Sequence, residues 1–362
     1  MTVIHGIEID DFEYKPNNIK KAIRTLNPIE NKLHVIAVIS NPCNYARRCI
    51  LMSEFKERMM RDEPDVILYV VELVYGKQRF HMTQSDNPRH LQLRTETPLW
   101  HKENMINMAV KKMLPADWKA MAWIDADLEF ESTTWAKDTL RILNGECDIV
   151  QLFSHCIDMN HQEYAMNIFS SAGFQYSKRL PYTHYAGGRQ NNFWHPGYAW
   201  ACTHTAYETM GGLFDKGILG SGDNIILLCL LQNGHKAIHV DSTDGYKQSV
   251  LEFQERVKEL RLGYVPGVIR HYFHGTKANR KYSERWNILL RHEYDPYLHV
   301  IYHSSGILVP TPMCPDGLKK DILHYFSERN EDDGLGSDGK YFCKETENIS
   351  TNIVDSNRSD SS

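Results

Sequence analysis

The fold is decided by the stretch Ala120-Met-Ala-Trp-Ile-Asp125-Ala-Asp127. Residues 120–125 have the length and apolar composition of a buried strand, and the second aspartate follows closely. Ligands bind at this edge of parallel α/β sheets, where the strands end. Two carboxylates at positions i and i+2 of an extended chain project to the same side, which suits a divalent cation that prefers oxygen ligands. A D-x-D triplet alone is weak evidence, and an aspartate pair that caps the following helix is the other interpretation.

Short apolar runs on both sides of this stretch predict further strands at 33–40, 66–73 and 148–153. Helices are expected over 45–59, where apolar residues recur at helical spacing, and over 135–144. Thr97-Pro98 predicts the start of another helix, which ends before Pro115, because threonine can cap a helix and proline suits its first turn. Strands that alternate with helices indicate an α/β fold with a mixed, mostly parallel sheet flanked by helices.

The second half of the chain is less regular. Residues 155–199 are rich in aromatic, glycine, histidine and asparagine side chains, and we expect loops around a site there. Further elements are expected as helices over 203–210, 225–232 and 283–292 and as a strand over 268–273. The domain organisation predicted from composition is a lead-in over 1–32, a single catalytic domain over 33–300, a C-terminal extension packed on it over 301–326 and a disordered tail over 327–362.

Composition excludes several classes of protein. The chain has 362 residues, and its 41 basic and 46 acidic residues leave a net charge of −5, which argues against binding nucleic acid through bulk positive charge. No apolar run approaches the roughly 20 residues needed to span a bilayer, and no signal peptide is visible. Eight scattered cysteines without a C-x-x-C pair favour reduced thiols in a cytoplasmic protein. P-loop, dinucleotide-binding, α/β-hydrolase and zincin motifs are absent.

A glycine-rich segment over 211–222 precedes Asp223. Glycines let the backbone approach a ligand closely. Asp223 stands at the start of an apolar helix, whose dipole favours its ionised form, so it is a candidate general base. A plain helix N-cap is an equally consistent interpretation of this aspartate.

Two other segments carry candidate binding residues. His271 and His274 could complete a carboxylate metal site, and the basic residues that follow them could hold phosphate. Structural histidines and an ordinary solvated basic face are the alternatives. Trp194, Tyr198 and Trp200 could form a platform for a sugar, because the C–H face of a sugar lies against aromatic rings, although core packing is the default for such residues.

Taken in order, these segments resemble the nucleotide-sugar-dependent glycosyltransferases of the GT-A fold, in particular a family-2-like group found in bacteria, phages and large viruses. The matching motifs are Ile39-Ser40-Asn41-Pro42, Val71-Glu72-Leu73, Leu99-Trp100-His-Lys102-Glu103-Asn104, Ala122-Trp123-Ile-Asp125-Ala-Asp127, Trp194-His-Pro-Gly-Tyr-Ala-Trp200, Gly-Ser-Gly222-Asp223 and His271-Tyr-Phe-His274-Gly with Arg280-Lys-Tyr282. The resemblance covers residues 33–300 and implies a Rossmann-like GT-A catalytic domain.

The resemblance also implies roles for the matched residues. Asp127 would bind Mn²⁺ or Mg²⁺, Asp125 would contact the metal or the ribose, and His274, with His271 as the alternative, would be a further ligand. Asp223 matches the catalytic base of inverting members. The positions implied to contact the nucleotide-diphosphate sugar, with a UDP-sugar favoured, are Ser40, Asn41, Glu72, Lys102, Asn104, Asp125, Lys277, Arg280 and Tyr282.

The expected reaction is transfer of a hexose to a hydroxyl group of a glycan, a peptide or another acceptor. A retaining enzyme stays open as an alternative, and in that case Asp223 would only orient the acceptor. A sugar-1-phosphate nucleotidyltransferase shares the sheet and the metal chemistry, but it normally has a glycine-rich loop where this chain has Asn41-Pro-Cys-Asn44. An inactive glycan-binding scaffold is the third alternative.

Overall fold

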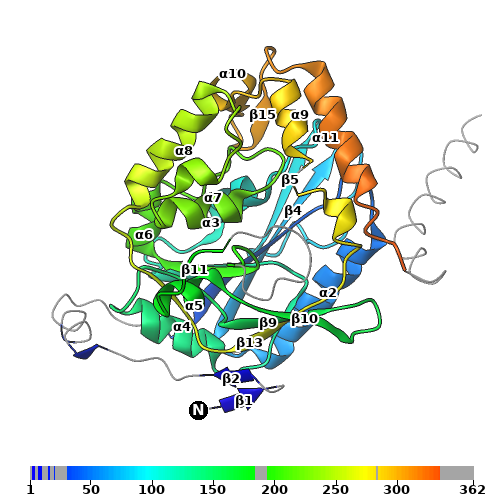
Figure 1. Ribbon diagram of the computed structural model, residues 1–362. Helices are drawn as coiled ribbons and strands as arrows, with labels where there is room; N and C mark the ends of the chain where they lie inside the picture. Colours follow the sequence, from blue (N-terminus) through cyan, green and yellow to red (C-terminus); the bar gives the residue numbers. More distant parts are fainter. Residues whose placement is uncertain are drawn as a thin grey trace, which may run out of the picture.

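The computed structural model describes residues 2–4, 7–9, 15, 16, 20, 31–183, 194–282 and 284–334, and a seven-stranded sheet lies at their centre (Figure 1). From edge to edge its strands are β12 (Leu262–Tyr264), β8 (Ile149–Gln151), β11 (Ala199–Thr203), β6 (Ala120–Ile124), β3 (Leu33–Ser40), β4 (Val66–Tyr75) and β5 (His90–Thr95). All neighbours run parallel except that β11 is antiparallel to both β6 and β8. The expected mixed, mostly parallel α/β sheet is confirmed.

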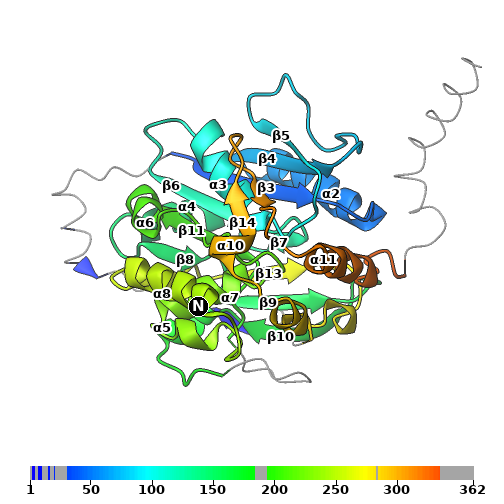
Figure 2. The same cartoon turned by 90° about the horizontal axis from the view of Figure 1, so that it is seen from above.

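Helices cover both faces of this sheet because its strands are apolar on both sides. Val35 and Ala37 of β3 pack in one core with α2 (Ala46–Asp62) and α4 (Trp135–Leu143). Ile36 points to the other core, which is shared with helices on the opposite face (Figures 1 and 2). Those helices are α3 (Lys102–Met113), α6 (His204–Met210), α7 (Gly222–Leu230) and α8 (Asp244–Val257).

A second sheet has four strands, and one of its edge strands follows β6 directly in the chain. Its order is β10 (Ala165–Ser170), β9 (His155–Met159), β13 (Val268–His271) and β7 (Leu128–Phe130). The loops expected over 155–199 are therefore partly wrong, since that segment contains β9, β10 and α5 (Ala172–Ser177), while residues 184–193 lie outside the described residues. β9 finds its parallel partner in β13, far along the chain, and such tertiary pairing can override a weak local signal.

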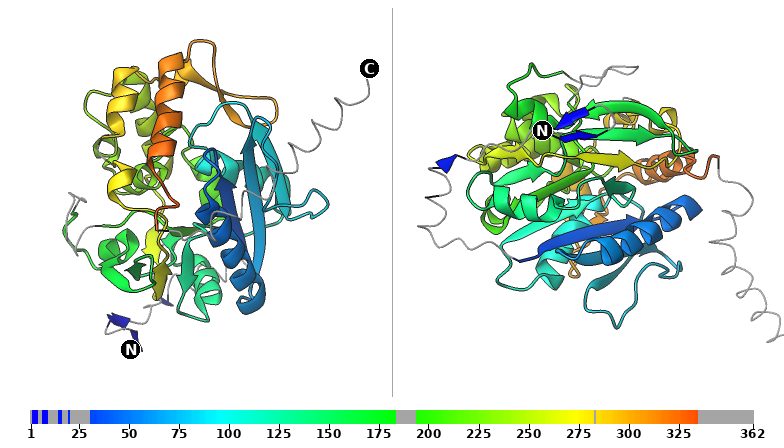
Figure 3. Two further views of the ribbon diagram at one scale, coloured as in Figure 1. Left: turned by 90° about the vertical axis from the view of Figure 1, so that its right-hand side faces the viewer. Right: turned by 90° about the horizontal axis from the view of Figure 1, so that it is seen from below.

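The described C-terminal part of the chain contains three helices and a hairpin. They are α9 (Trp286–Arg291), α10 (Pro296–His299), the hairpin of β14 (Val300–Tyr302) and β15 (Leu308–Pro310), and α11 (Asp316–Glu328). α11 lies beside α9 (Figure 3). Order continues beyond the expected start of the tail at 327, because Glu331 is only 1% exposed. Residues 335–362 lie outside the described residues, and within the lead-in β1 (Thr2–Ile4) pairs with β2 (Ile7–Ile9).

The start of α3 differs from the sequence prediction. The helix begins at Lys102, not at Thr97-Pro98. Before it, the Trp100 N–H donates to the Ile218 carbonyl at 2.9 Å, and Leu99 is buried, so tertiary contacts hold this stretch outside the helix. The seven cysteines in the described part of the chain are free thiols, as expected. Among the described helices, none has the length and apolar character required to cross a bilayer.

Candidate active site

A cavity of about 1030 Å³ lies at the carboxyl ends of β3 and β6, between the two sheets and the C-terminal part. It brings together most of the residues singled out in the sequence, which are Ser40, Lys102, Asp125, Asp127, Trp194, Tyr198, Asp223, His271, His274, Lys277, Arg280 and Tyr282. Residues that are far apart in the chain thus share one concave surface, the usual form of a small-molecule site.

Glu72 and Asn41, which were predicted to contact the nucleotide, instead hold nearby loops and turns in place. The Glu72 carboxylate accepts hydrogen bonds from the backbone N–H groups of residues 81–83 and from the Thr83 hydroxyl, so it fixes the loop that follows β4. Asn41 accepts from the Tyr45 N–H and donates to the Tyr45 carbonyl, both at 2.8 Å, which closes the turn before α2. Neither side chain lines the cavity.

Asn104 and Trp200 also lie outside the cavity lining. Asn104 accepts from the Leu308 N–H at 3.0 Å and donates to Asp215 at 3.2 Å, so it ties α3 to the C-terminal hairpin. Trp200 stacks on Trp123 in the core, with ring planes 8° apart. The expected nucleotide role of Asn104 and platform role of Trp200 do not agree with these positions.

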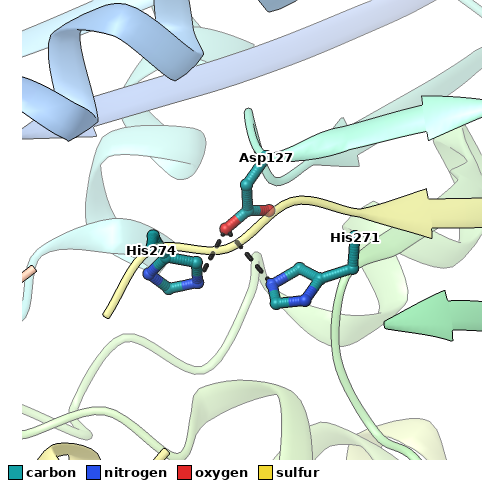
Figure 4. A group of neighbouring side chains, drawn as sticks. All are labelled: Asp127, His271 and His274. Carbon is teal, nitrogen blue, oxygen red and sulfur yellow. Dashed lines mark ion pairs between the residues drawn. The ribbon is translucent and has the colours of Figure 1, made fainter. Parts of the chain in front are cut away.

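Asp127, His271 and His274, which we call the imidazole cluster, meet at the end of β6 (Figure 4). Asp127 leaves β6 and enters β7, while the two histidines sit at the end of β13 and just after it. The Asp127 Oδ2 lies 2.9 Å from His274 Nε2 and 3.5 Å from His271 Nε2. Their candidate ligand atoms all lie within 4.8 Å of one another, so the structure brings both histidines to the carboxylate.

The imidazole cluster fits a divalent cation. Two of its buried atoms, Asp127 Oδ1 and His271 Nε2, make no hydrogen bond with any described residue, although buried polar atoms normally have a partner. Burial opposes ionisation of Asp127, but the imidazoles of His274 and His271 outweigh it and hold the pKa of the carboxyl well below its usual value. Burial, with the charge of Arg280, lowers the pKa of His274 to about 4, which favours a neutral ring whose Nε2 accepts from Arg280. Carboxylate oxygens suit Mn²⁺ and Mg²⁺, and imidazole nitrogens suit first-row transition metals, so the mixed set is compatible with a divalent cation such as Mn²⁺.

Asp158 of β9 is a neighbour that the sequence analysis missed. It is 1% exposed, and its Oδ1 lies 2.7 Å from His271 Nδ1. Its carboxylate also pairs with the Lys277 ammonium. Burial would raise the pKa of Asp158, but the bonds to His271 and Lys277 lower it to about 2. No local motif marks this aspartate, because its place depends on the pairing of β9 with β13.

On the other side of the cavity, Lys102 forms what we call the lysine cluster with Asp125, Asp223 and Glu103. Its Nζ lies 2.6 Å from Asp125 Oδ1 and 3.1 Å from Asp223 Oδ2. Burial raises the pKa of Asp125 to about 6 even though Lys102 opposes this shift. Glu103 is 3% exposed and packs on Gly222, where a Cβ would collide with its carboxylate. Burial, together with the charge of Asp223, raises the pKa of Glu103 to about 8.

Aromatic rings form the floor between the two clusters. Tyr198 has a left-handed backbone, with φ of 84°, and its carbonyl accepts from the Asp125 N–H at 2.9 Å. Its ring stacks on His195 at 4.1 Å and on His271 at 4.5 Å between centroids. Asp223 lies over Gly197, where an added Cβ would come within 3.4 Å of its Oδ2. The left-handed backbone conformation of Tyr198 is uncommon for a non-glycine residue, and such residues often occur at functional sites.

Basic side chains line the side of the cavity next to His274. Arg280 Nη2 lies 2.8 Å from His274 Nε2, and its Nη1 lies 3.1 Å from the Tyr282 hydroxyl. Burial opposes ionisation of Tyr282, but Arg280 outweighs it and lowers the pKa of the hydroxyl. Arg285 donates to Ser221, the residue before α7, at 2.6 Å. Neither arginine pairs with a described carboxylate, so both can meet an anionic ligand.

The wall next to this basic side comes from residues 329–334, which we call the C-terminal strap, and which pack against Gly275 and Asn279. Its Glu331 pairs with Arg48 of α2 and with Arg329. All three side chains line the cavity. The polar composition of this segment predicted disorder, and only the distant arginine on α2 reveals why it is ordered.

No protein-family model matches this sequence, and no curated protein is similar to it in sequence. Among solved structures, the catalytic domain of a Drosophila β1,4-galactosyltransferase 7 with xylobiose is 10% identical, covers 81% of this chain and 99% of that chain, and gives a TM-score of 0.32. A mutant of that enzyme with manganese, UDP-Gal and xylobiose is 10% identical, with coverages of 81% and 98% and a TM-score of 0.34. A Desulfovibrio desulfuricans protein whose structure carries the description "putative nucleotide-diphospho-sugar transferase" is 10% identical, with coverages of 73% and 99% and a TM-score of 0.29. At these scores the similarities by themselves assign no activity to this chain.

Proposed function

We propose that this chain is a metal-dependent glycosyltransferase that moves a hexose from a nucleoside-diphosphate sugar to an acceptor hydroxyl, with inversion at the anomeric carbon. The observation that carries the proposal is the placement of the imidazole cluster and the Asp223 carboxylate in the walls of one cavity. Glycosyl transfer needs both a cationic partner for the leaving diphosphate and a base for the acceptor. The cavity supplies candidates for each.

Asp127, His271 and His274 would hold Mn²⁺ or Mg²⁺. When bound, such a cation neutralises the charge of a leaving diphosphate. Arg280 and Tyr282, next to His274, would bind the phosphate oxygens as charged and neutral donors. Lys277 pairs with Asp158 and adds positive charge at the same edge. These residues would hold the leaving group on the side of the cavity formed by the second sheet.

Asp223 would take the proton from the attacking acceptor hydroxyl on its carboxylate. Lys102 bridges Asp223 and Asp125, so it fixes the direction in which both carboxylates point. Asp125 and Ser40 would contact the donor nucleoside, since both lie at strand ends that open into the cavity. Trp194 and Tyr198 would lie beneath the transferred sugar or the acceptor as an aromatic surface.

The test is a panel of donors incubated with the full chain. UDP-glucose, UDP-galactose, UDP-N-acetylglucosamine and GDP-mannose are each supplied with Mn²⁺, with Mg²⁺ or with a chelator, and the released nucleoside diphosphate is measured. We expect release from one donor class only, and only with metal. Release that is unchanged by the chelator, or no release from any donor, contradicts the proposal. The anomer of the product, read by NMR, separates inversion from retention.

A further inference from the structure

Asp158 is a buried charged residue for which the proposed reaction has no step. It lies in the middle of the second sheet, and the parallel register of β9 with β13 pairs it with His271. A buried carboxylate is costly unless its partners compensate for lost water. Its partners here are one histidine of the imidazole cluster and one lysine. The sheet therefore presents this carboxylate to His271 from the side away from Asp127.

The contact fixes which nitrogen of His271 is free. Asp158 Oδ1 accepts from Nδ1 at 2.7 Å, so the hydrogen of a neutral ring sits on Nδ1. The other nitrogen, Nε2, faces Asp127 at 3.5 Å and makes no hydrogen bond with a described residue. A neutral imidazole with hydrogen on Nδ1 presents its lone pair at Nε2. That lone pair points into the cluster.

Two further contacts hold the pair in place. The Lys277 ammonium offsets the charge of Asp158 and, at 5.7 Å, lies over the ring of Phe169. The Tyr198 ring stacks on His271 with planes 29° apart and limits rotation of the imidazole. The ring of His271 is thus fixed by its hydrogen bond and by its stacking partner.

We propose that Asp158 is a positioning residue for cation binding, which holds His271 with Nε2 available as a metal ligand. The inference rests on the proposed function only in that the imidazole cluster binds a divalent cation. The proposal also means that His271 and His274 both bind the metal, where the sequence analysis had treated them as alternatives. Partners of this kind set the orientation and basicity of ligand histidines, and their loss typically lowers metal affinity by about 10- to 100-fold.

The test measures Mn²⁺ affinity of the metal-free full chain by EPR of the unbound ion, with no substrate present. We expect Asp158→Ala to lose about 10- to 100-fold in affinity. Asp158→Asn keeps an acceptor oxygen and should lose less than the alanine variant. Asp117→Ala, which removes an exposed carboxylate, is the matched control and should bind as the wild type does.

A double-mutant cycle separates positioning from general destabilisation. In a His271→Ala background, a change at Asp158 should cause no further loss of Mn²⁺ affinity, because its effect passes through the ring. If the alanine variant does not fold, Asp158→Asn, which has the same shape, is used in the same cycle. Wild-type affinity in the Asp158 variants, or equal losses in both backgrounds, overturns the positioning role alone. A wild-type chain that binds no Mn²⁺ overturns both this role and the metal dependence of the proposed reaction.

Discussion

Asp125 and Asp127 leave the same strand two residues apart and meet opposite surroundings. Asp125 lies against the Lys102 ammonium, which also reaches Asp223, so this side of the cavity already contains its cation. Asp127 faces two imidazoles and keeps one buried oxygen without a hydrogen bond. The comparison teaches that the lysine cluster already holds its carboxylates with an ammonium, whereas the imidazole cluster leaves buried ligand atoms without a hydrogen bond.

The largest effect should come from Asp223→Asn, which keeps the shape of the lysine cluster and removes the base. We expect kcat to fall by about 10²- to 10⁴-fold, the usual contribution of a general base. Mn²⁺ affinity should stay within about threefold of wild type, because Asp223 is not part of the imidazole cluster. Steady-state kinetics and an Mn²⁺ titration measure the two. A variant with wild-type kcat removes Asp223 from the mechanism.

The paired variants Asp127→Asn and Asp125→Asn test the comparison directly. Asp127→Asn should lose about 100-fold or more in Mn²⁺ affinity, because the charged ligand of the cluster is gone. Asp125→Asn should change it by less than about fivefold, since Lys102 already neutralises that carboxylate. Isothermal titration of the metal-free chain gives both numbers. Equal losses in the two variants would mean that the two carboxylates share one cation and that the distinction fails.

Local signals in the sequence predicted the strands that carry the two clusters, but they did not predict the residues that reach a cluster through distant partners. The apolar runs predicted strands over 120–125 and 268–273, and the structure has β6 over Ala120–Ile124 and β13 over Val268–His271, so both strand ends were located within two residues. Asp158 was missed because its partner His271 is 113 residues away and only the paired strands bring them together. Glu331 was missed for the same reason, since its arginine lies on α2.

The strand-end rule also produced an error. It correctly placed Glu72 near the edge of the sheet where ligands bind, but it gave no information about the loop over residues 81–83, which folds back and takes up the carboxylate. A single sequence shows where a strand ends, but it does not show which backbone groups return to that end. Roles assigned by position therefore need the tertiary contacts before they hold.

Glu103 provides a pH test of the lysine cluster, because Lys102 already serves two other carboxylates. Its native pKa is about 8, raised by burial from 4.5. Between these values the unfolded chain releases a proton that the native state keeps, so stability should fall as pH rises from about 4.5 to 8. Glu103→Gln removes this slope. Relative to wild type, the variant should gain on the order of 3 kcal/mol between pH 5 and pH 8 in denaturant unfolding.

The exposed Glu208→Gln is the control for that experiment and should follow the wild type at every pH. A stability difference between Glu103→Gln and wild type that stays constant from pH 5 to pH 8 would mean that Glu103 is ionised in the native protein. In that case the lysine cluster holds three charged carboxylates against one ammonium. The lysine cluster would then carry an excess of negative charge, whereas the imidazole cluster has a single carboxylate that faces two rings.

The smallest effect concerns the C-terminal strap. The Asp332 carboxylate accepts from the backbone N–H groups of Ala46 and Arg47 at 3.1 and 2.9 Å, so it caps α2, whose own N-cap residue makes no capping bond. Asp332→Ala should cost about 1 kcal/mol and lower Tm by about 2 °C, while the exposed Asp333→Ala should not. Arg47 also donates to the carbonyl of Phe273, between the two cluster histidines. A loosened strap should therefore weaken Mn²⁺ binding slightly and leave the Lys102 contacts unchanged, whereas equal effects on both sides would show that the strap supports the whole cavity.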